Sequence, residues 1–130
     1  MLYDYRVLLI SADFELVRNA VFTEPADQSS WLYLRWLISQ TYELCEKNLI
    51  TVTDLSERLK KEIESVTELK ELEPDSKWVL LTYVYLVSMA KEASLHAQSV
   101  SETLQRLSDV DPFRRNYYKS LMPQIHEEKK

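Results

Sequence analysis

The sequence contains no glycine in 130 residues. At an average usage of about 7%, a chain of this length would contain roughly nine. Tight hairpin turns often need a residue with positive φ, which glycine adopts without steric cost, so strand-rich folds lose their ordinary connections here. The composition therefore favours helices that are joined by proline and polar turns. The chain is long enough for one domain with its own core.

The stretch 24–38 shows how one such helix would begin. Pro25 fixes its own φ and suits a turn or the first position of a helix. Asp27, Ser29 and Ser30 can each accept a hydrogen bond from the free amides at the start of a helix. We therefore expect a helix from about Asp27 to Lys47.

This helix carries more large aromatic residues than a core stripe needs. Trp31, Leu34 and Ile38 recur at helical spacing, which places them on one face. Three further residues lie beside that face or widen it: Tyr33, Arg35 and Trp36. We expect a helix that packs inward and also presents groups to a partner.

The order of acid, proline, polar residues, aromatic residue and apolar run returns along the chain. It occurs again in segments 73–81 and 111–118, whose aromatic residues are Trp78 and Tyr117, and residues 3–10 echo its second half. Units that recur tens of residues apart indicate a helical-repeat architecture. The predicted fold is all-α, with about six helices arranged as antiparallel hairpins of an α-α superhelix, in a single domain over residues 1–130.

Hydrophobic periodicity and capping signals give approximate limits for the other helices. We expect the tail of a helix over 2–10, followed by a helix that is capped by Ser11 and Asp13 and runs to about Thr23. A later helix should start at Thr51 or Thr53, and the next should be opened by Pro74. The last two should be a helix with a capping box at Ser99 and Glu102, and a helix that starts at Asp111 and Pro112 and is ended or kinked by Pro123. One packed layer is expected to contain Trp31, Leu34, Ile38, Leu80, Leu81, Val84 and Leu107.

The sequence offers no self-contained active site. His96 and His126 have no cysteine or histidine at metal-ligand spacing, and a chain without glycine has no phosphate-binding glycine loop. The carboxylates lie in helical surface patterns without apparent pairing. We expect no catalytic residue, cofactor site or metal site in this chain.

Charge and hydropathy exclude further classes. A net charge of −5 argues against a nucleic-acid partner. The single cysteine, Cys45, cannot form an internal disulfide, which fits a reducing compartment. The longest uncharged run, 78–90, is shorter than the roughly 20 residues that a membrane-spanning helix needs.

Three stretches, residues 15–38, 68–81 and 109–118, resemble the alpha subunit of protein prenyltransferases, and within that group Rab geranylgeranyltransferase. The resemblance covers most of the chain and is weakest between Ser39 and Ser65. It implies a crescent of helical hairpins that wraps a separate beta subunit, which holds the zinc and most of the isoprenoid pocket. The implied reaction is the transfer of geranylgeranyl groups to C-terminal cysteines of Rab GTPases, which an escort protein delivers, by a cytoplasmic heterodimer.

The resemblance also assigns roles to single residues. Six residues match the repeat signature of the family or its later forms: Trp31, Tyr33, Arg35, Trp36, Trp78 and Tyr117. Trp31 and Trp78 are expected to pack within hairpins. Tyr33 and Arg35 are the candidates for reaching a partner, with a purely structural role as the alternative.

The chain departs from the family pattern in its extent. The earlier repeats, with a lysine that contacts the isoprenoid diphosphate, have no counterpart before Met1. The inserted β-sandwich and the leucine-rich repeats of some members are also absent. The chain is therefore expected to be the C-terminal part of an alpha subunit, as a fragment or a reduced subunit. Four residues at its start are expected to lie uncovered and to favour dimers or aggregation: Leu2, Tyr3, Tyr5 and Leu9.

Two other functions stay open from the sequence. The first is a helical-repeat scaffold without enzymatic function that binds a peptide or protein. The second is a zinc enzyme in its own right, which bound zinc in the purified chain would indicate.

Overall fold

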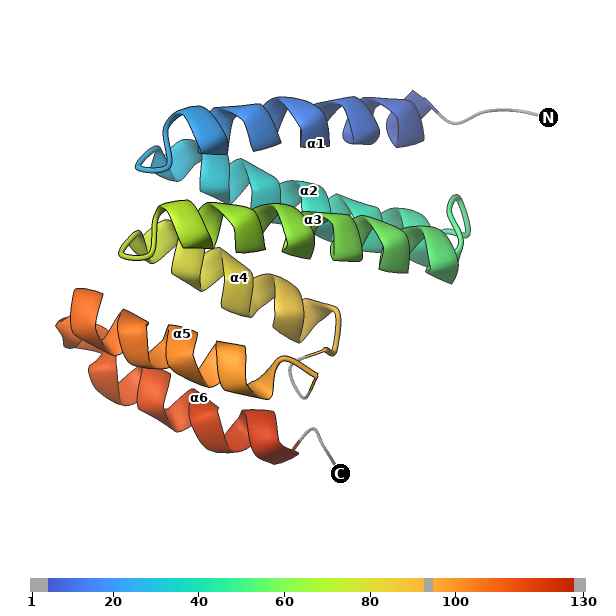
Figure 1. Ribbon diagram of the computed structural model, residues 1–130. Coiled ribbons are helices and arrows are strands. Elements are labelled where there is room, and N and C mark those ends of the chain that lie inside the picture. The colour runs from blue at the N-terminus through green and yellow to red at the C-terminus, as the bar shows by residue number, and fades with distance from the viewer. Residues whose placement is uncertain (1–4, 93–94, 128–130) are drawn as a thin grey trace. The chain divides into compact units, whose positions relative to one another are not determined.

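The computed structural model describes residues 5–92 and 95–127 (Figure 1). Within these ranges the regular structure is entirely helical, and no residue lies in a strand. The elements are α1 (Tyr5–Thr23), α2 (Gln28–Glu46), α3 (Val52–Leu72), α4 (Lys77–Met89), α5 (Ala97–Val110), the short 3-10 helix η1 (Pro112–Arg114) and α6 (Arg115–Glu127). The predicted all-α class is confirmed.

The chain divides into two compact units, Met1–Lys61 and Glu62–Lys130, and the boundary falls inside α3. In the first unit, α1 and α2 pack together as an antiparallel hairpin (Figure 1). In the second unit, α5 packs against both α4 and α6. The predicted hairpin arrangement is thus present in each unit, and the single domain over residues 1–130 stays a prediction.

Two of the predicted helix starts match the structure closely. Asp27 caps α2, where its Oδ1 accepts from the amide of Ser29 at 3.1 Å. Thr51 and Asp54 form a reciprocal cap at the start of α3, because each side chain accepts from the amide of the other at 3.0 Å. These starts are set by residues within one turn of the helix, which is why local sequence reveals them.

The predicted helix start at Ser11 and Asp13 was wrong, because α1 is one continuous helix through both residues. Neither side chain is available as a cap. Ser11 Oγ accepts from Arg58 Nη2 at 3.1 Å, and Asp13 Oδ2 accepts from the Tyr33 hydroxyl at 2.7 Å. Both side chains have the residue type of a helix cap, but each forms a contact between helices instead.

The prediction for the start of α5 was wrong in a similar way. α5 already begins at Ala97, so Ser99 lies in its first turn and not at a capping position. Glu102 accepts from the side chain of Gln98 at 3.3 Å and forms no capping box. α6 continues beyond Pro123 to Glu127, so the helix does not end at the proline, and the alternative of a kink there stays a prediction.

The predicted core layer was correct for some residues and wrong for others. Trp31, Leu34 and Ile38 are buried in the first unit, and Leu80 and Leu107 are buried in the second. In α4, however, Leu81 and Val84 are only half-buried, while the buried positions include Val79, Tyr83, Leu86 and Val87. The helix is apolar nearly all round, so its sequence carries little information about which side faces the core.

Candidate functional site

The three acid–proline turns share one hydrogen-bond geometry. The amide of the acidic residue bonds to a carbonyl four residues earlier and so closes the preceding helix. The carbonyl of the same residue accepts from the amide three residues later and so opens the next helix. The amide of Glu24 donates to the carbonyl of Ala20 at 2.9 Å, that of Glu73 to Leu69 at 2.8 Å and that of Asp111 to Leu107 at 2.8 Å. The carbonyls of these three acidic residues accept from the amides of Asp27 at 3.1 Å, Ser76 at 3.2 Å and Arg114 at 3.1 Å, respectively. The repeated sequence order therefore encodes a repeated turn.

The residue seven positions after the acidic residue is buried in all three turns. These residues are Trp31, Leu80 and Tyr118. Trp31 Nε1 donates to the carbonyl oxygen of Pro25 at 2.7 Å, and the Tyr118 hydroxyl donates to Oδ2 of Asp111 at 2.6 Å. Each aromatic residue at this position thus bonds back to its own turn and ties the helix to it.

The two later motif residues named from the sequence, Trp78 and Tyr117, occupy other positions. Trp78 is half-buried beside Lys77, whose Nζ lies 5.4 Å from the centre of the indole ring. Tyr117 is 58% exposed. Sequence reasoning aligned the turns on their aromatic residues and so missed Leu80 and Tyr118, which counting from the acidic residue identifies.

The third turn carries a small charged cluster. The Asp111 carboxylate accepts from the Tyr118 hydroxyl and, at 2.9 Å, from Arg114 Nη1. The hydrogen bond from Tyr118, followed by the one from Arg114, holds the pKa of Asp111 below its usual range. Burial, followed by the bond to Asp111, raises the pKa of Tyr118 to about 12. The cluster therefore holds a neutral phenol against an ionised carboxylate at neutral pH.

Helix α2 presents an aromatic surface outside the core. The rings of Tyr33 and Trp36 stack with their centres 5.5 Å apart at an interplanar angle of 21°. Trp36 is 50% exposed, and Tyr33 is also exposed. The bond from Tyr33 to Asp13 of α1 raises the pKa of the phenol and holds its ring in place. We call Tyr33 and Trp36 the aromatic face of α2.

Two grooves follow the line where α1 meets α2 and adjoin this aromatic face. One, of about 310 Å³, is lined by Trp36 together with Leu9, Leu44 and several charged residues, among them Arg6, Asp13, Glu43 and Lys47. The other, of about 290 Å³, is lined by Leu16, Val17, Ala20, Ser29, Ser30 and Tyr33. Apolar surface bordered by charged side chains is the composition expected of a surface that binds another protein.

Arg35 is half-buried and does not share this surface. Residues two apart on a helix lie on opposite sides, so Arg35 lies across the helix from Tyr33. The structure therefore brings Tyr33 together with Trp36, and it places Arg35 at the other edge of the buried stripe of α2.

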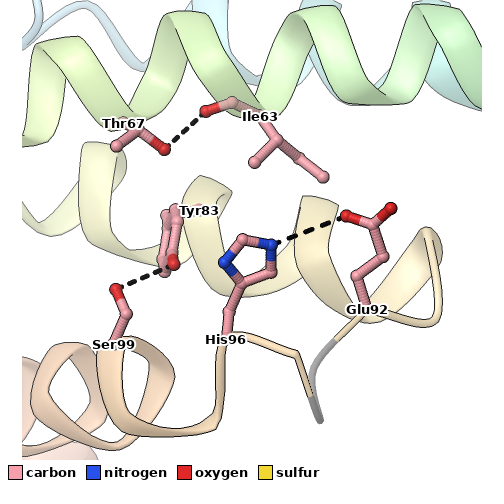
Figure 2. A network of polar contacts seen from close by, with 6 residues as sticks. All are labelled: Ile63, Thr67, Tyr83, Glu92, His96 and Ser99. Carbon is pink, nitrogen blue, oxygen red and sulfur yellow. Dashed lines mark hydrogen bonds and ion pairs between the residues drawn. The ribbon is translucent and has the colours of Figure 1, made fainter.

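Polar contacts in the second unit join α3, α4 and α5. The Tyr83 hydroxyl donates to Ser99 Oγ at 2.8 Å, and in the same region His96 Nε2 lies 3.6 Å from Glu92 Oε2 (Figure 2). Lys70 Nζ lies 3.8 Å from the centre of the Tyr83 ring and donates to Ser99 Oγ at 3.0 Å and to Thr103 Oγ1 at 3.2 Å. Partial burial lowers the pKa of Lys70. Because the hydrogen bonds of this network join different helices, we assign the network a role in helix packing.

Within residues 5–92 and 95–127, no three His, Cys, Asp or Glu side chains come together as a metal centre would require. In that part of the chain, no helix combines the length and apolar character that crossing a membrane takes.

Comparison with known proteins gives a consistent set of relatives, although no family model matches the chain. Geranylgeranyl transferase type-2 subunit alpha of Dictyostelium discoideum is 40% identical over 116 residues, which are 89% of this chain and 35% of the relative. The proteins of the same name from Schizosaccharomyces pombe and Saccharomyces cerevisiae are each 31% identical and cover 91% and 88% of this chain. The chain spans 37% and 36% of those two relatives, so it corresponds to about a third of their length. The chain belongs to the family of geranylgeranyl transferase type-2 alpha subunits.

Proposed function

We propose that this chain acts as part of the alpha subunit of a Rab geranylgeranyltransferase. In that role it would support the transfer of geranylgeranyl groups to C-terminal cysteines of Rab GTPases by a zinc-containing beta subunit, with an escort protein delivering the Rab. The observation that carries the proposal is the similarity to type-2 alpha subunits over about nine-tenths of the chain, across both compact units. The relatives are named as alpha subunits, which implies a beta subunit as partner.

The chain's own contribution is to bind and to position. Its helices would hold a beta subunit in the cytoplasm, and the chemistry would take place on that subunit. The described residues support this division, since their conspicuous polar clusters, around Asp111 and around Lys70, are hydrogen-bonded within the fold.

The aromatic face of α2 is the part of this chain best suited to the beta subunit. Tyrosine and tryptophan are enriched among the residues that dominate binding energy at interfaces. The Tyr33 ring is already fixed by its bond to Asp13 and by stacking on Trp36, so little side-chain freedom would be lost on binding. Arg35 would contribute a second contact from the other edge of the helix.

The proposal is tested by producing the chain together with a tagged type-2 beta subunit and measuring the affinity of the purified pair. We expect a complex, and we expect Trp36→Ala and Arg35→Ala each to weaken it by at least ~1 kcal/mol, which is about fivefold. Tyr117→Ala is the matched control, because it removes an aromatic ring of similar exposure from the second unit.

Each outcome has a distinct meaning. A folded chain that captures no beta subunit would contradict the proposal and favour the helical-repeat scaffold. If Arg35→Ala leaves binding unchanged and lowers thermal stability sharply, Arg35 has a structural role, and the binding surface is the aromatic face alone.

A further inference from the structure

We draw no further inference here: the strongest candidate, the groove of about 350 Å³ in the first unit that is lined by apolar residues of α1 and α2 and by charged residues of α3 between Asp54 and Lys61, carries no proposal, because nothing in the structure shows what covers or occupies it.

Discussion

The first and third acid–proline turns solve the same structural problem with different chemistry. In the first, the indole of Trp31 donates to a backbone carbonyl, and in the third, the phenol of Tyr118 donates to a carboxylate. Both side chains are only 1% exposed, and both follow the acidic residue of their turn by the same number of residues. In these two turns a buried donor therefore stands at the same position, although the residue type that supplies it differs.

This difference has a consequence for the response to pH. Neither the indole nor the carbonyl of the first turn titrates in the ordinary range, whereas both partners in the third turn do. The second turn places Leu80 at the same position, so it has the burial without the hydrogen bond. The following predictions test how far the three turns are equivalent.

The largest effect is expected from Trp31→Ala. The change removes a fully buried ring and its bond to Pro25, and it should lower the free energy of unfolding by ~3–5 kcal/mol. Trp78→Ala should cost clearly less, because that ring is only half-buried. Urea unfolding followed by circular dichroism measures both. Equal losses would show that the two tryptophans are equivalent after all.

Tyr118→Phe should have the next largest effect. It keeps the ring and removes the hydroxyl from Asp111, which retains its bond from Arg114. We expect a loss of ~1–3 kcal/mol in the free energy of unfolding at neutral pH, since a hydrogen bond to a charged group is lost. Thermal unfolding at a fixed pH provides the comparison, and an unchanged midpoint would mean that the bond contributes nothing net.

The same variant should change how stability depends on pH. The folded chain holds the proton of Tyr118 more tightly than the unfolded chain, so this stabilisation is complete below pH 10 and is lost as pH rises towards about 12. The pKa of Asp111 is lowered, so its contribution is present above its ordinary value of 3.8 and is lost as pH falls below that. Tyr118→Phe should flatten the alkaline decline, whereas Trp31→Phe should leave its shape unchanged.

The smallest effect is expected from Tyr117→Ala. Its ring lies beside that of Tyr118 but is mostly exposed, so the free energy of unfolding should change by no more than about 0.5 kcal/mol. Chemical denaturation of this variant beside Tyr118→Phe compares neighbouring residues directly. A greater loss for Tyr117→Ala would reverse the assignment of the buried position.

Local features of the fold could be predicted from the sequence, whereas features that depend on tertiary contacts could not. The starts of α2 and α3 follow from Asp27 and Thr51, whose side chains cap amides of their own first turn. The continuity of α1 could not be predicted, because Asp13 has the residue type of a helix cap but accepts a hydrogen bond from Tyr33, which lies on another helix. The same holds for Ser99, whose partners lie on α3 and α4.

The candidate site shows the same division. Periodicity placed Trp31 inside and identified the aromatic cluster around it. It did not reveal that Tyr33 pairs with Trp36 and that Arg35 lies on the other side of the helix. Sequence also gave no direct sign that the aromatic partner of the third turn is Tyr118, because Tyr117 beside it fits the same composition pattern.

The most direct test of the proposed role is hydroxyl-radical footprinting of the chain, alone and bound to a type-2 beta subunit. In the free chain, Trp36 and Tyr33 should be oxidised readily and Trp31 only slowly, in line with their exposure. In the complex, we predict that oxidation of Trp36 and Tyr33 falls while that of Tyr117 stays the same. A stable complex in which Trp36 remains as reactive as in the free chain would contradict the assignment of the aromatic face of α2 to the beta subunit.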